Sequence, residues 1–191
     1  MKNVYKGLII TFLSAGIIPL VIWLLIRLTP VPPTNDIQTA METLSRAGRD
    51  KADTYSKKLY TEAKAAYDSA MANWGRENMR FIFFRNYEKV EMYAKLSAKK
   101  ASLAKDSSHT NSSALKVKLK DKIDSLKKTA ANIDKLFDRY PMSSEIRKRI
   151  SKGNLLLKEG EDTFKKGQYL PSNKKITEAE YLLTGVYGNA T

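Results

Sequence analysis

Residues 115–137 of the 191-residue chain read LKVKLKDKIDSLKKTAANIDKLF, and this stretch decides the fold class. Its apolar residues recur at alternating intervals of four and three. They are Leu119, Ile123, Leu126, Ala130, Ile133 and Phe137. An α-helix has 3.6 residues per turn, so this spacing places all of them on one helical face. The stretch therefore predicts a long amphipathic helix that packs this face against other helices.

The same helical face extends towards the N-terminus. Small side chains at Val90, Ala94, Ser97, Ala101 and Ala104 keep the phase and allow a neighbouring helix to approach closely. The polar run 106–113 (DSSHTNSS) has the composition of a linker, yet Ser108 and Ser112 stay in phase. We therefore expect one continuous helix of about 75 Å from near residue 86 to residue 137, with a weak spot at 107–113.

Two further helices are expected after this one. Pro141 ends the long helix, and Ser143 can cap the next one. That helix carries Ile146, Ile150, Gly153, Leu157, Gly160 and Phe164 on one face, and its two glycines predict close packing. Gly167 breaks it. A last helix begins near Pro171 and presents Ile176, Ala179, Leu183 and Val186.

The region before residue 86 predicts one more helix and a connector. Helical spacing runs from Asp36 to about Gly75, with a possible bend at Gly48. The connector 75–85 (GRENMRFIFFR) holds Phe81, Phe83 and Phe84. We interpret it first as a loop whose aromatic rings cap the end of the bundle. The alternative is an exposed aromatic and basic patch for a partner or a membrane surface.

The N-terminal part of the chain has the properties of a membrane anchor. No charge occurs from Gly7 to Ile26, and about 20 apolar residues span the hydrocarbon core of a bilayer. No small-x-small cleavage site follows, which argues against a cleaved signal peptide. We expect a transmembrane signal anchor at residues 8–28, preceded by a short basic cytoplasmic tail (1–7) and followed by a Pro-rich spacer (29–35).

These elements predict an all-α protein. An N-terminal transmembrane helix precedes an elongated antiparallel bundle of about four helices at residues 36–187, and residues 188–191 form a C-terminal tail. The short tail carries two lysines and no acid, which favours a cytoplasmic N-terminus. The expected location is therefore the inner (cytoplasmic) membrane, crossed once, with most of the chain outside the cytoplasm. The lipid bilayer is then the partner of residues 8–28.

Catalytic chemistry has few candidates in this sequence. The chain has no Cys and one His, which excludes disulfides, a thiolate nucleophile and multi-His zinc sites. His109 lies in the polar run 106–113, where a solvated surface position is expected. No phosphate-binding loop, EF-hand or HExxH motif occurs. The sequence predicts no enzyme, no catalytic residue, no cofactor and no metal.

A formal net charge of +14 suggests an anionic partner, although a basic solvated surface without a ligand would have the same composition. The basic residues gather in two clusters. They are Lys116, Lys118, Lys120, Lys122, Lys127 and Lys128, and then Arg147, Lys148, Arg149 and Lys152. An extracytoplasmic position excludes nucleic acid, so lipid head groups or cell-wall polymers are the expected anions. The long apolar faces also allow a homo-oligomer.

Three segments resemble a known family: AKAAYDSAMANW (63–74), FFRNYEKVEMYAKLSAKKASLAK (83–105) and FKKGQYLPSNKKITEAEYLL (164–183). With residues 115–137, they resemble the helical region that precedes the catalytic domain in some bacterial membrane-anchored L,D-transpeptidases. They are also similar to short Ala-rich helical envelope proteins of unknown function. The resemblance covers about residues 50–187 and implies a role in peptidoglycan maintenance. The family's catalytic domain, with its Cys nucleophile and partner His, has no counterpart, so no catalytic residue is carried over.

Three hypotheses follow. The first is a non-catalytic scaffold or spacer in the envelope near peptidoglycan, with an envelope protein or peptidoglycan as partner. The second is the anchor and helical portion of an L,D-transpeptidase system whose catalytic domain is absent from this chain. The third is a binder of anionic membrane or cell-wall surfaces that uses Phe81, Phe83 and Phe84 with the basic clusters.

Overall fold

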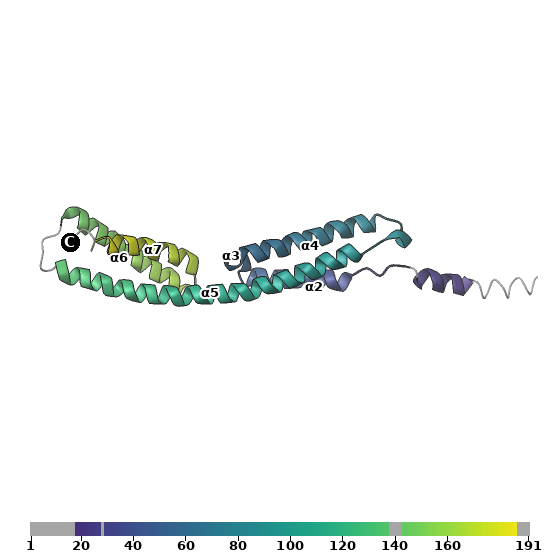
Figure 1. Ribbon diagram of the computed structural model, residues 1–191, viewed down its shortest axis with the longest axis horizontal. Coiled ribbons are helices and arrows are strands. Elements are labelled where there is room, and N and C mark those ends of the chain that lie inside the picture. The colour runs from purple at the N-terminus through teal and green to yellow at the C-terminus, as the bar shows by residue number, and fades with distance from the viewer. Residues whose placement is uncertain (1–17, 28, 138–142, 187–191) are drawn as a thin grey trace, which may run out of the picture. The chain divides into compact units, whose positions relative to one another are not determined.

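A computed structural model describes residues 18–27, 29–137 and 143–186, and within these ranges every regular element is a helix (Figure 1). The predicted all-α class is therefore confirmed. The elements after residue 33 are α2 (Thr34–Arg49), α3 (Ala52–Tyr55), α4 (Lys57–Asn78), the 3-10 helix η1 (Ile82–Phe84), α5 (Glu88–Phe137), α6 (Ser144–Lys165) and α7 (Tyr169–Thr184).

Residues 18–27 are also helical. In the part of the chain that the structure describes, no helix is both long and apolar enough to cross a membrane. Most of the expected anchor at 8–28 lies outside the described residues. The expected cytoplasmic tail (1–7), the turn at Pro141 and the C-terminal tail (188–191) lie outside them as well.

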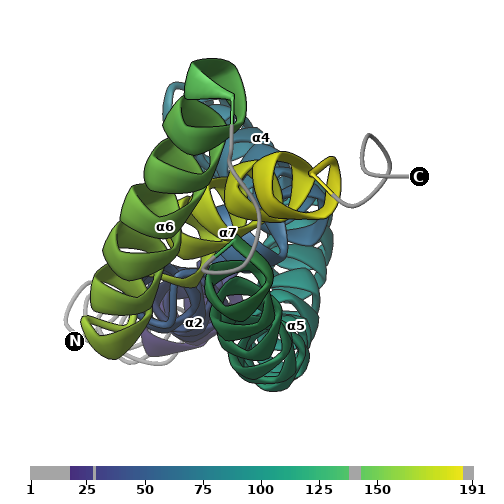
Figure 2. The ribbon, with the colours of Figure 1, turned by 90° about the vertical axis from the view of Figure 1, so that its left-hand side faces the viewer.

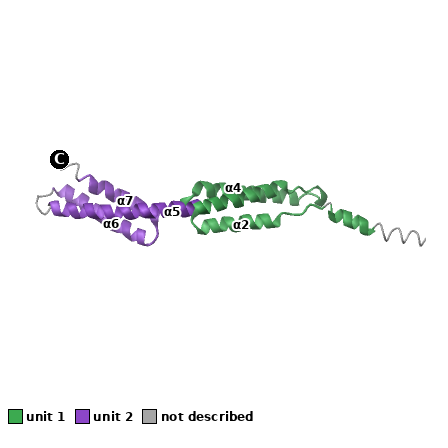
Figure 3. Cartoon of the chain, turned by 60° about the horizontal axis from the view of Figure 1, so that its bottom comes forward, with its two compact units in different colours: residues 1–106 green, residues 107–191 purple. Residues whose placement is uncertain are grey.

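The chain divides into two compact units, unit 1 (residues 1–106) and unit 2 (residues 107–191) (Figure 3). The sequence led us to expect a single bundle at residues 36–187. The boundary falls inside α5, so the first part of this helix packs in unit 1 and the rest in unit 2. α5 nevertheless continues through residues 107–113 as one 50-residue helix, as predicted.

In unit 1 the predicted single helix from Asp36 to Gly75 is wrong. The chain reverses after α2, and α4 packs back against it. Two buried clusters define the direction: Ala40 lies with Ala70 and Ala94, whereas Ala47 lies with Ala63. α4 is therefore antiparallel to α2 and to the first part of α5, and these three helices form the unit.

The reversal has a local cause in the backbone. Lys51 adopts a left-handed conformation with φ of 56°, which ordinary helices do not tolerate, and α3 follows it as a single turn. Gly48 does not bend a continuous helix. A Cβ at Gly48 would lie 3.1 Å from the hydroxyl oxygen of Tyr60, so the glycine lets α4 approach α2 closely.

The interior of unit 1 is built from small side chains. Ala40, Ala63, Ala70, Val90 and Ala94 are fully buried, as are other alanines of the same faces. The buried hydroxyl of Ser97 donates a hydrogen bond of 2.9 Å to the carbonyl oxygen of Ala63, which satisfies this polar group across the α4–α5 contact. The predicted stripe of small residues on α5 is thus the packing surface of the unit.

Figure 2 shows the ribbons of α5, α6 and α7. These three helices supply the core of unit 2, which consists of larger residues. Most of the predicted positions are buried. They include Leu119, Ile123, Leu126 and Ile133 from α5, Ile150 and Leu157 from α6, and Ile176, Ala179, Leu183 and Val186 near or on α7. The hydroxyl of Ser143 accepts a hydrogen bond of 3.3 Å from the backbone N–H of Ile146, which confirms the predicted cap of α6.

Glycines bring α6 and α7 together. A Cβ at Gly160 would lie 2.6 Å from Cδ1 of Ile176, and a Cβ at Gly153 would lie 2.9 Å from the side chain of Leu183. The predicted close packing is confirmed. Gly167, with φ of 72°, ends α6: its N–H donates to Phe164 O, and that of Gln168 donates to Thr163 O, a Schellman motif.

The Gly160→Ala substitution is expected to lower the free energy of unfolding of unit 2 by about 1 kcal/mol, because the new methyl group overlaps a fully buried side chain. Urea unfolding followed by circular dichroism measures the change. The control is Gly75→Ala in α4, where nothing lies within 4 Å of the new Cβ. This control is expected to raise stability by about 0.5–1 kcal/mol. Equal gains for both variants would contradict the close contact.

Candidate functional site

In the ranges that the structure describes, no group of three or more His, Asp or Glu side chains could hold a metal ion. His109 is exposed on α5, in agreement with its predicted surface position. Several Glu carboxylates form ion pairs with lysines of neighbouring helices. One of them joins Lys100 to Glu62 at 2.6 Å and lowers the pKa of that carboxyl group.

The connector between α4 and α5 carries several exposed apolar side chains. Phe81, Phe83 and Phe84 are 66%, 37% and 74% exposed, and Met79 is 89% exposed. The ring of Phe81 lies 5.5 Å from that of Phe83 and 6.1 Å from that of Phe84. The interpretation that these rings cap the bundle is therefore wrong, because they contact one another and face solvent. We call residues 79–85 the aromatic loop.

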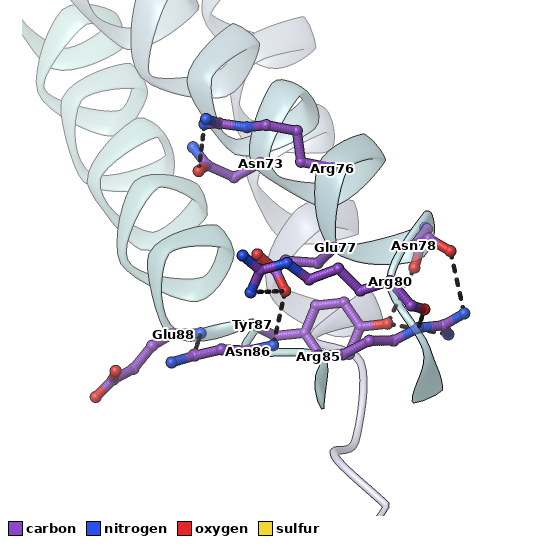
Figure 4. A network of polar contacts seen from close by, with 9 residues as sticks. All are labelled: Asn73, Arg76, Glu77, Asn78, Arg80, Arg85, Asn86, Tyr87 and Glu88. Atoms are coloured by element: carbon purple, nitrogen blue, oxygen red, sulfur yellow. Dashed lines mark hydrogen bonds and ion pairs between the residues drawn. The ribbon is translucent and has the colours of Figure 1, made fainter. Parts of the chain in front are cut away.

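Hydrogen bonds hold the backbone of the aromatic loop (Figure 4). The guanidinium of Arg85 donates to the carbonyl oxygens of Asn78 and Arg80, both at 3.1 Å. The carboxylate of Glu77 accepts from the backbone N–H of Asn86 at 2.9 Å. The two ends of the loop are thereby joined across its base.

Tyr87 adds a second attachment between the same helices. Its hydroxyl donates to the side-chain oxygen of Asn78 at 2.9 Å, and its ring lies 5.7 Å from that of Trp74. Asn86 caps α5 by accepting from the N–H of Glu88 at 2.9 Å. The exposed phenylalanines are consequently presented by a loop that is fixed at its base. This network was not predicted from the sequence, although an Asn before an amphipathic helix is a recognisable capping signal.

The predicted lysine cluster does not form one surface. Successive helical residues are rotated by about 100°, so Lys118 lies on the other side of α5 from Lys116 and Lys120. Lys127 returns to the side of Lys116, whereas Lys128 lies about 100° away from it. The run is dense in sequence, but the helix distributes its charges around the axis.

Three of the ten predicted basic contacts are paired with acids inside unit 2. Lys122 pairs with Glu180, Lys127 with Glu161 at 2.8 Å, and Lys152 with Glu178 at 3.1 Å. Hydrogen bonds from Lys127 and from Lys165 hold the pKa of Glu161 below its usual value. These three pairs join α5 to α7, α5 to α6 and α6 to α7, respectively. Part of the basic excess therefore stabilises the packing of unit 2.

The other basic cluster is divided in a similar way. Arg147 and Lys148 are exposed and line a surface hollow with Ser144 and Ser151. Arg149 instead turns towards α7: a Cβ at Gly185 would lie 2.8 Å from its guanidinium. The aromatic loop belongs to unit 1, whereas both basic clusters belong to unit 2.

Comparisons of the chain with protein-family models, with curated proteins and with solved structures find no match. The resemblance to the helical region of L,D-transpeptidases therefore stays a prediction from the quoted segments.

Proposed function

We propose that this protein is a non-catalytic scaffold or spacer of the bacterial cell envelope that acts near peptidoglycan. A single helix at residues 8–28 holds it in the inner membrane. Residues 1–7 lie in the cytoplasm, and the helical units lie outside it. The bilayer is the partner of the anchor, and an envelope protein or peptidoglycan is the partner of the helical units.

The observation that carries this proposal is the apolar N-terminal segment. The side chains of residues 18–26 are exposed all around their helix; Trp23 and Ile26, for example, are 63% and 69% exposed. A helix that is hydrophobic on every side is typical of a protein core or a membrane. The uncharged stretch begins at Gly7, so its length suits a bilayer.

A spacer role fits the way in which the helices use their side chains. The buried faces of α4 to α7 are taken up by packing within the two units. The 50-residue α5 corresponds to about 75 Å of helix and is continuous through both units. Exposed cations such as Lys116, Lys128 and Arg147 favour an anionic polymer nearby.

Membrane topology can be tested directly because the chain has no cysteine. Ser113, exposed on α5, and Asn3, in the predicted tail, are replaced by Cys one at a time in the full chain. A membrane-impermeant maleimide is expected to label Ser113→Cys in spheroplasts, and Asn3→Cys only after lysis. The reverse pattern, or recovery of the chain in the soluble fraction, would overturn the proposed anchoring.

The cell-wall contact needs its own measurement. Detergent-solubilised full-length protein is mixed with purified peptidoglycan at physiological salt and sedimented. We expect the protein in the pellet, or an envelope protein co-purifying with it. If neither is found, the scaffold proposal fails. If a transpeptidase co-purifies, the helical portion serves an L,D-transpeptidase system.

A further inference from the structure

We propose that the aromatic loop is a second membrane contact, which places the rings of Phe81, Phe83 and Phe84 in the interfacial layer of the bilayer that holds the anchor. The inference rests on the membrane anchoring proposed above. It adds a statement about orientation: the loop end of unit 1 faces the membrane.

The aromatic loop lies at the end of the packed helices α2, α4 and α5 where α2 begins. α2 is parallel to α5 because Ala40 clusters with Ala94 and Ala47 with Ala101. The beginning of α2 is therefore at the same end as the beginning of α5 and the end of α4 (Figure 1). Charges agree with this arrangement, since the carboxylate of Glu91 and then that of Asp36 raise the pKa of Lys95.

The spacer is too short to move this end far from the bilayer. Thr34 begins α2, and the expected anchor ends at residue 28. Six residue steps cover at most about 20 Å even when fully extended. The prolines at 30, 32 and 33 further limit the conformations of the spacer. An anchor in the membrane therefore keeps the start of α2, and with it the aromatic loop, close to the membrane surface.

The chemistry of the loop suits a lipid interface. Aromatic side chains favour the region of the head groups, and Met79 and Ile82 extend the apolar surface of the three rings. Arg76, Arg80 and Lys89 line a hollow beside the loop together with Glu77 and Glu88, which leaves a cationic excess for anionic lipids.

The fixed base of the loop also favours this role. Hydrogen bonds of Arg85, Glu77 and Tyr87 join the two ends of the loop. The folded unit itself therefore holds the rings in their exposed positions. Rings that are already exposed and ordered lose little conformational freedom on binding. A protein partner could use the same rings, but the short distance to the anchor favours the bilayer, which is always present at this end.

The test uses full-length protein in vesicles of phosphatidylethanolamine and phosphatidylglycerol. Phe84 is replaced by Cys and labelled with an environment-sensitive fluorophore. The matched control is Thr54→Cys, exposed at the opposite end of unit 1 in α3. We expect the label at 84 to shift to shorter wavelength and to be quenched by lipids that carry a spin label near the head group. The label at 54 is expected to do neither.

Each outcome separates the loop from the anchor. Protein that does not float with the vesicles contradicts the anchoring itself. Protein that floats while the label at 84 stays unquenched overturns the loop contact alone, and a cross-link from 84 to another protein in cells would then identify the competing partner. In a Phe81→Ser, Phe83→Ser background, quenching at 84 is expected to be lost. Its persistence would also overturn the proposal, since the rings would then not be what inserts.

Discussion

Replacing Ile176 by alanine is expected to lower the free energy of unfolding of unit 2 by about 2–5 kcal/mol. Ile176 is fully buried among the apolar residues of α5, α6 and α7. Its side chain packs on the backbone at Gly160, where no side chain is available to fill the space that alanine leaves. Loss of transfer free energy and an unfilled cavity therefore act together.

Hydrogen exchange of the α7 backbone amides measures this effect in unit 2 separately from unit 1. The matched control is Leu155→Ala in α6, a residue that is 56% exposed. A substitution at such a position is expected to change stability by no more than about 0.5 kcal/mol. Similar losses for the two variants would show that α7 does not seal the core as described.

Enlarging Ala70 to leucine is expected to destabilise unit 1 by about 1–3 kcal/mol. Ala70 of α4 is fully buried and meets Ala40 of α2 and Ala94 of α5. The three helices approach so closely because each contributes a methyl group at this level. A leucine would force the helices apart or adopt a strained rotamer.

Exchange protection in α4 and α2 reports this change. The control is Ala65→Leu, an exposed position of the same helix at which leucine meets solvent and keeps a good helix propensity. We expect protection to fall for Ala70→Leu and to stay unchanged for Ala65→Leu. If Ala70→Leu preserved or raised protection, the alanine-lined contact would be refuted.

Helical faces were predictable where the chain continues without reversal. The spacing of Leu119, Ile123 and Leu126 predicts a buried face, and the three are 0%, 4% and 3% exposed. The helix ends at Ser143 and Gly167 could also be predicted, since each depends on one local residue type and its nearest backbone groups.

The reversal between α2 and α4 could not be read from periodicity. Apolar spacing continues from Leu44 to Leu59, so a bend was the simpler interpretation. The left-handed backbone lies at Lys51, and lysine is not a residue type that signals this conformation in a sequence. Within α2, Ala40 is fully buried at the close contact, whereas Met41 is 49% exposed.

The shape of the candidate surfaces depends on tertiary contacts that the sequence does not show. Three phenylalanines in seven residues suggest burial, whereas in the structure Arg85 and Glu77 close the base of the loop and the rings are exposed. The lysine run suggests one patch, whereas α5 spreads it around its axis and acids of α6 and α7 pair with Lys122 and Lys127.

The sequence by itself determined that this protein is helical, which faces of α5, α6 and α7 are buried, and that no charge occurs from Gly7 to Ile26. These properties depend on residues a few positions apart, whose spacing is set by the geometry of the helix. Only the tertiary structure decided that α4 folds back on α2 and that alanines line one unit while larger residues fill the other. It also decided that the aromatic loop is exposed at the end of the α2, α4 and α5 helices where α2 begins. These properties depend on contacts between residues far apart in the chain, and local spacing carries no information about them.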